Sequence, residues 1–223
     1  MDFIRGTLAI LWKDLAAEAR SKELLSAMLV FSLLTIIVFN FALELDKAAR
    51  DTVTAGVVWV TVIFAGTLGL NRSLAQEQDR GSLEGVLLTP VDRSAIYFGK
   101  VMGNILFMTV IEVIILPVFN LLFRVPLLHW GVALTAALGT VGYAAVGTLL
   151  AAMAVRTRAR EVMLPVLLLP VVIPVLLAGV KATTGFLELR PLDEITPWLN
   201  LLLGYDVLFV AVALLVFDYV VEE

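Results

Sequence analysis

The chain has 223 residues, of which 61% are hydrophobic, and its mean hydropathy is +0.99. Soluble domains have an apolar content closer to half, so this composition excludes a soluble globular protein and indicates an integral membrane protein. The net charge of -4 is mild, no dense run of Lys and Arg suggests a nucleic-acid partner, and the absence of cysteine excludes disulfides and thiolate metal sites.

Residues 1–22 are predicted to form an amphipathic helix in the membrane interface. Apolar residues recur at helical spacing at Ile4, Leu8, Leu11, Trp12, Leu15 and Ala19. Charged residues fill much of the rest, and Trp12 is expected at the depth of the lipid headgroups. The alternative is a solvated leader that frays. The first apolar span has full membrane length and no small-residue cleavage site follows it, so no signal peptide is expected.

Six apolar stretches are long enough to cross roughly 30 Å of hydrocarbon as helices. They lie at about 24–43, 52–71, 101–123, 130–155, 162–180 and 199–217. The predicted fold class is an all-α integral membrane protein, with one transmembrane domain over residues 1–223. The termini, the 71–100 stretch and the 156–161 turn hold 11 Lys and Arg, against 5 in the opposite connections. Because cytoplasmic loops carry the excess, both termini are predicted in the cytoplasm.

The polar stretch 71–100, between the second and third spans, is the most informative segment for function. Its core can form a short helix, with Gly81 and Ser82 at the start and Pro90 at the end. An apolar face is formed by Leu83, Val86 and Leu87, and mixed charge is supplied by Glu77, Asp79, Arg80 and Glu84. This combination favours docking to a partner protein through registered ion pairs. A solvated loop is the alternative.

The fourth and fifth spans carry patterns that predict helix packing and bending. Small residues recur every fourth position at Ala136, Thr140, Ala144, Thr148 and Ala152, which predicts a packing seam within one subunit or between two. The fifth span contains Pro165, Pro170 and Pro174. Each proline removes a helical hydrogen bond, so this helix is expected to kink or break and to face protein rather than lipid.

Two carboxylates fall within predicted spans, where ionisable groups are costly and usually retained for a reason. Glu112 near the middle of the third span is interpreted as a hydrogen-bonded acid that ties helices together, with a proton or substrate contact as the alternative. Asp206 lies in the sixth span, unless residues in 182–203 form short re-entrant helices that move it towards the outer surface. The single histidine, His129, has no partner residues for a metal site.

Several of these residues together resemble the cytochrome c maturation protein B family, also called haem exporter protein B. The resemblance covers nearly the whole chain and rests on Trp59, the run Asp79-Arg80-Gly81-Ser82-Leu83-Glu84 with Leu87-Leu88 and Pro90, Gly99-Lys100-Val101, Leu168-Leu169-Pro170 and Ile173-Pro174. It implies a permease subunit of an ABC transporter complex in the bacterial cytoplasmic membrane that serves c-type cytochrome biogenesis.

On this resemblance, residues 80–89 would be the coupling helix to a separate ATP-binding subunit, and Arg156, Arg158 and Arg160 would form a second cytoplasmic contact. Haem would be liganded by a haem-handling membrane partner and a haem chaperone, with a second copy of this chain as a further candidate partner. The chain has no Gly-x-x-x-x-Gly-Lys loop, so ATP hydrolysis is expected elsewhere and no cofactor is expected on this chain.

Other functions remain open at this point. Similar Gly-x-Leu-Glu segments occur in permeases that export polysaccharide, lipid or drug. A membrane scaffold for an assembly complex, without transport, is a further alternative. An intramembrane enzyme is disfavoured, because no nucleophile, base and orienting group converge in the sequence.

Overall fold

The computed structural model describes residues 3–43, 47–79, 92–154 and 160–222, with side chains over 3–43, 53–73, 92–154 and 162–216. The described chain is helical, in the order α1 (Phe3–Ser21), α2 (Glu23–Ala42), α3 (Lys47–Asp79), α5 (Arg93–Phe123), α6 (Trp130–Ala154), α7 (Arg160–Leu187) and α8 (Leu192–Glu222). Within these residues, six helices are long and apolar enough to cross a membrane. The predicted all-α membrane fold with an N-terminal helix before six spans is confirmed.

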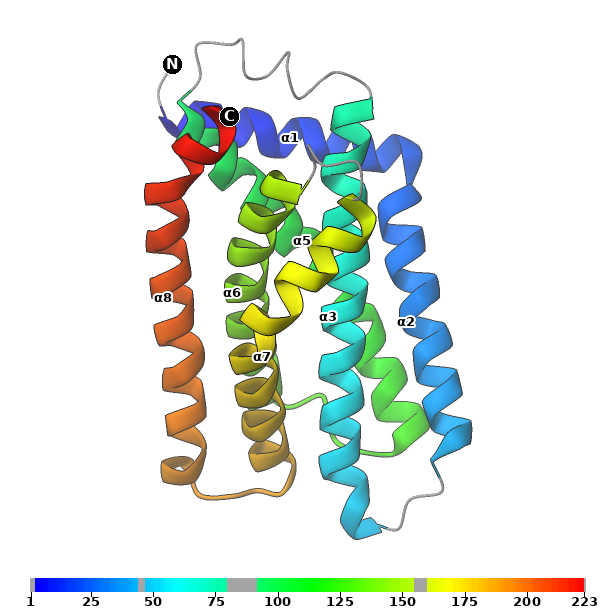
Figure 1. Cartoon of the computed structure of the whole chain (residues 1–223). Helices are drawn as coiled ribbons and strands as arrows, with labels where there is room; N and C mark the ends of the chain where they lie inside the picture. Colours follow the sequence, from blue (N-terminus) through cyan, green and yellow to red (C-terminus); the bar gives the residue numbers. More distant parts are fainter. Residues whose placement is uncertain (1–2, 44–46, 80–91, 155–159, 223) are drawn as a thin grey trace.

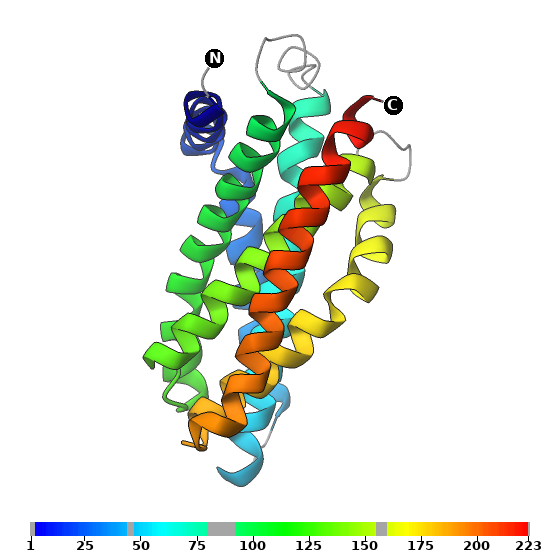
Figure 2. The ribbon, with the colours of Figure 1, turned by 90° about the vertical axis from the view of Figure 1, so that its left-hand side faces the viewer.

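The six long helices form a bundle, and α1 lies across one end of it (Figure 1). In the perpendicular view α1 is seen nearly along its own axis (Figure 2). The central helix is α6, which contacts α3, α5, α7 and α8, while α2 packs on α3 and α5. The first turn of α1 and the last turn of α8 lie at the same end, as six crossings require (Figure 1).

The helix α5 begins at Arg93, earlier than the span predicted from Val101. Its N-cap is Asp92, whose side chain accepts a hydrogen bond from the Ser94 backbone N–H at 3.0 Å. The first turns of α5 are buried although they contain polar residues, with Tyr97 1% exposed. Burial against α1 and α6 therefore extends the helix beyond the limit that hydrophobicity alone predicts.

The connection between α7 and α8 is a tight turn. The Arg190 N–H donates to the Gly185 carbonyl at 2.9 Å, and the Leu189 N–H donates to the Phe186 carbonyl at 3.3 Å. Leu189 has a φ of 53°, so the two bonds and this left-handed residue form a Schellman motif that ends α7. The re-entrant helices considered for 182–203 do not form, because α7 continues to Leu187 and α8 begins at Leu192.

The three prolines of the fifth span lie inside α7, which continues as one helix from Arg160 to Leu187. The ribbon of α7 nevertheless changes direction: its first half runs obliquely across the bundle and its second half runs along the bundle axis (Figure 1). Proline inside a helix bends it because the ring crowds the preceding turn and one hydrogen bond is lost. The helix is bent rather than broken.

Candidate functional site

The residues predicted to contact an ATPase fall largely outside the described residues. This applies to Arg80, Gly81, Ser82, Leu83, Glu84, Leu87 and Pro90, and to Arg156 and Arg158. Glu77 and Asp79 belong to the last turns of α3 and Arg160 begins α7, but the side chains of all three also lie outside the described set. Their docking role stays a prediction. The helix ends that flank both segments lie at the end of the bundle crossed by α1 (Figure 1).

Close packing joins α1 to the first turns of α5, directly after the 80–91 segment. A β-carbon added at Gly99 would lie 2.7 Å from Ile10 Cβ and 2.9 Å from the Thr7 carbonyl oxygen. Only glycine therefore allows the two helices to approach this closely. Beside this contact, the rings of Phe3 and Phe98 meet edge to face with centroids 5.7 Å apart.

A buried ion pair lies at the same junction. The Lys100 Nζ is 2.8 Å from the Asp14 Oδ2, and these side chains are 5% and 11% exposed. Lys13 also pairs with Asp14, at 3.0 Å, from a more exposed position. Because the Lys100 side chain is almost fully buried, its pair with Asp14 favours one register of α1 on α5.

A second carboxylate of α1 joins it to α2. The Glu18 side chain accepts hydrogen bonds from the Leu25 N–H at 2.9 Å and the Leu24 N–H at 3.4 Å, at the start of α2. The connecting residue, Lys22, has a φ of 55°. Glu18 thus satisfies backbone donors that the first turn of a helix leaves free. Together, Asp14 and Glu18 attach α1 to two spans.

This role of Asp14 and Glu18 was not predicted from the sequence, where the charged residues of 1–22 were assigned only to the positions that the apolar residues leave free. The buried face consists of Gly6, Thr7, Ile10 and Glu18, with Asp14 nearly as covered. Ile4, Leu8 and Trp12 instead form an exposed apolar row. The available signal was spacing, since Ile10, Asp14 and Glu18 follow one another every four residues and share a helix face.

Glu112 is buried between α5 and α6, where the Thr140 Oγ1 donates a hydrogen bond to its Oε1 at 2.5 Å. About two helical turns nearer to α1, the Asn104 Nδ2 donates a hydrogen bond to the Thr148 Oγ1 at 2.9 Å. Both contacts join side chains on the same two helices. Such hydrogen bonds between helices contribute about 0.6 kcal/mol each in membrane proteins. Glu112 is therefore placed to tie α5 to α6.

The small residues of α6 make room for large side chains of its neighbours within the same chain. Trp59 of α3 fills the space over Gly139 of α6 and Gly179 of α7, and its Nε1 donates to the Thr183 Oγ1 at 2.9 Å. Of the predicted seam, Thr140, Ala144 and Thr148 are fully buried. These three positions therefore pack inside one subunit.

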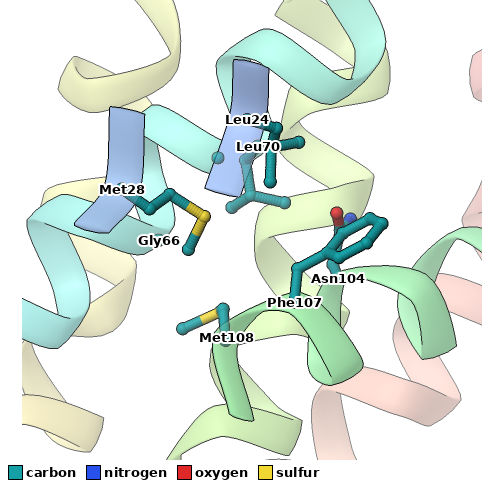
Figure 3. A pocket seen from close by; sticks show the side chains of 8 residues that line it. Leu24, Met28, Gly66, Leu70, Asn104, Phe107 and Met108 are labelled. Carbon is teal, nitrogen blue, oxygen red and sulfur yellow. The ribbon is translucent and has the colours of Figure 1, made fainter. Parts of the chain in front are cut away.

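A small pocket lies between α2, α3 and α5 (Figure 3). It is lined by Leu24, Met28, Gly66, Gly69, Leu70, Asn104, Phe107 and Met108. Ligand pockets typically hold about 300–1,000 Å³, whereas this one has no room for a water-sized molecule. It is therefore a packing gap of the core. The described residues contain no group of three His, Asp or Glu side chains that could hold a metal ion.

Comparison with known proteins agrees with this architecture. The family model described as "CcmB protein" matches residues 5–222. Proteins named "Heme exporter protein B" are similar to the chain: the one from Pseudomonas aeruginosa is 30% identical over 172 residues, which is 77% of this chain and 77% of that protein. Those from Haemophilus influenzae and Rhodobacter capsulatus are 27% and 25% identical over 76% and 78% of this chain, and 77% and 80% of their own lengths. The chain therefore belongs to the CcmB protein family.

Proposed function

We propose that this chain is the membrane permease subunit of an ABC transporter complex that serves c-type cytochrome biogenesis, by haem export or by release of a haem-loaded chaperone. The observation that carries the proposal is the match of the family model over residues 5–222, together with relatives named for haem export. The six candidate spans, with α1 lying across one end of the bundle (Figure 1), provide the transmembrane domain that such a subunit needs.

The proposed partner at the α1 end of the bundle is a separate ATP-binding subunit. Its contact would be formed by 80–89 and by Arg156, Arg158 and Arg160, since the helices that flank both segments end there (Figure 1). The α1 helix supports this proposal because its contacts with α2 and α5 give that end a fixed frame. Movement of the 80–91 segment would therefore reach α5, α1 and α2 together.

We further propose that the subunit lies in the bacterial cytoplasmic membrane, with the α1 end in the cytoplasm. The excess of Lys and Arg on this side supports the orientation. ATP and haem would be bound by partner subunits: the ATPase, a haem-handling membrane protein and a haem chaperone. A second copy of this chain is a further proposed partner.

The experiment that tests the proposal is affinity purification of the full chain from native membranes, with mass spectrometry of bound proteins and an absorbance scan for haem. An ABC ATPase together with a haem-containing membrane protein is the expected result. Recovery of an ATPase together with enzymes of envelope-sugar synthesis would indicate that the transported cargo is not haem. Recovery of the intact chain without any ATPase would contradict transport of haem and of any other cargo. A membrane scaffold would then be the remaining function.

A further inference from the structure

Two consecutive residues near the middle of α8 connect this helix to both of its neighbours. The Tyr205 hydroxyl donates a hydrogen bond to the Val171 carbonyl of α7 at 3.0 Å. The next residue, Asp206, lies against Gly142 of α6 and is 6% exposed. None of the family-resemblance motifs includes either residue.

The carbonyl that Tyr205 reaches belongs to the bend of α7. Val171 lies between Pro170 and Pro174, where the helix loses the hydrogen bond that a residue other than proline at 174 would donate to the Pro170 carbonyl. The Tyr205 hydroxyl adds a hydrogen bond from α8 to the next carbonyl along this bend. The Tyr205 ring packs on Phe209 with centroids 4.3 Å apart.

The contact of Asp206 with α6 requires glycine at position 142. A β-carbon added there would lie 2.2 Å from the Asp206 Oδ1 and 2.8 Å from Tyr205 Cδ1. Glycine at this position therefore lets the Asp206 carboxyl lie directly against the α6 backbone. This close contact sets the position of α8 on α6.

We propose that Tyr205 and Asp206 form a latch that fixes the bend of α7 relative to α6 and α8. In this arrangement Tyr205 ties α8 to the bend of α7, and the close contact of Asp206 with Gly142 fixes α8 on α6. A change in the direction of the first half of α7 must break the Tyr205 bond. The latch thus holds the first half of α7 at a fixed angle to α6 and α8, whatever cargo the complex handles.

Spin-label distances in the purified full chain can test the latch, because the sequence has no cysteine. Labels at Val166 of α7 and Leu215 of α8 would both be on exposed positions and would report on the oblique half of α7. Tyr205→Phe removes the hydroxyl and keeps the ring. We expect the single main peak of the wild-type distance distribution to shift or to split in this variant.

Two control substitutions separate the latch from general loss of packing. Tyr97→Phe removes an equivalent hydroxyl, which donates to the Ala145 carbonyl at 2.9 Å between α5 and α6, and it should leave the Val166–Leu215 distribution unchanged. Gly142→Ala should displace α8 and change the distribution. Gly204→Ala adds the same methyl group on α8, where no atom lies within 4 Å, and should not.

A Tyr205→Phe distribution that superimposes on the wild-type distribution would overturn the proposal, as would an equal change in Tyr97→Phe. The measurement uses the chain without partner proteins. It therefore stays informative if co-purification contradicts the transport function, and the two proposals can fail separately.

Discussion

At the scale of single residues, charged and polar side chains fix which helices meet. Asp14 and Lys100 form a buried pair between α1 and α5, Glu18 caps α2, and Glu112 meets Thr140 between α5 and α6. In hydrocarbon, apolar side chains gain little by leaving lipid for protein, so these specific contacts and close glycine packing determine the arrangement. Loss of one partner should therefore be more harmful than loss of both.

The Asp14–Lys100 pair leads to a direct prediction. Asp14→Leu removes the carboxylate that faces the buried Lys100 ammonium, and removing one partner of a buried pair costs at most about 3–5 kcal/mol. We expect a clear decrease in the thermal unfolding midpoint of the purified protein. The double variant Asp14→Leu with Lys100→Met should recover most of this loss, since neither charge remains. Lys13→Ala, which removes the more exposed partner, should cost no more than about 1 kcal/mol.

Glu112 gives a second prediction at this scale. If the side chain serves to tie α5 to α6, Glu112→Gln keeps a hydrogen-bond acceptor for Thr140 and should retain transport-coupled ATPase activity. Thr140→Val should destabilise the protein by about 1–3 kcal/mol, because it removes the hydroxyl donor facing a buried carboxyl group. Activity lost in Glu112→Gln with unchanged stability would instead assign a proton-exchanging role to Glu112.

At the scale of helices, the sequence was sufficient for the number and order of the spans but not for all of their ends. Six apolar stretches predicted six helices because each is long enough to cross a bilayer. The start of α5 at Arg93 could not be read from hydropathy, since Lys100 is buried through its pair with Asp14 of α1 and Tyr97 is buried through its contact with α6. The latch residue Tyr205 was missed for a similar reason, because its partner is a backbone carbonyl on another helix.

The end of α7 shows a second limit of sequence reasoning. Glycine is the usual residue at the left-handed position of a Schellman motif, and Leu189 gives no such signal. An ordinary residue there costs roughly 1–2 kcal/mol. Leu189→Gly should therefore raise the free energy of unfolding by about 1 kcal/mol, measured as a higher thermal midpoint. Leu192→Gly, at the helical first residue of α8, should give no such gain. An equal increase in both variants would contradict this explanation.

At the scale of the whole molecule, the α1 end and the opposite end of the bundle differ in kind. The α7–α8 turn at the opposite end is closed by its own backbone hydrogen bonds and by the Arg190–Glu188 ion pair. The α1 end instead carries the termini of α3, α5 and α7 and the helix that attaches to α2 and α5 (Figure 1). A partner ATPase that docks there would act on several spans through one rigid contact.

The predicted coupling role of 80–89 can be tested by charge reversal. Glu84→Lys should place a positive charge where docking requires a negative one, and like-charge contacts at an interface cost several kcal/mol. ATPase activity of the reconstituted complex should then fall to the basal rate of the ATP-binding subunit, while membrane insertion and α-helix content stay at wild-type levels. Asp193→Lys makes the same charge change on an exposed residue at the opposite end of the bundle and should leave coupled turnover intact. Unchanged turnover in Glu84→Lys would rule out 80–89 as the coupling helix. An equal loss of coupled turnover in both variants would indicate an effect of the net charge of the chain rather than of docking. The two substitutions have in common only that a negative charge becomes positive.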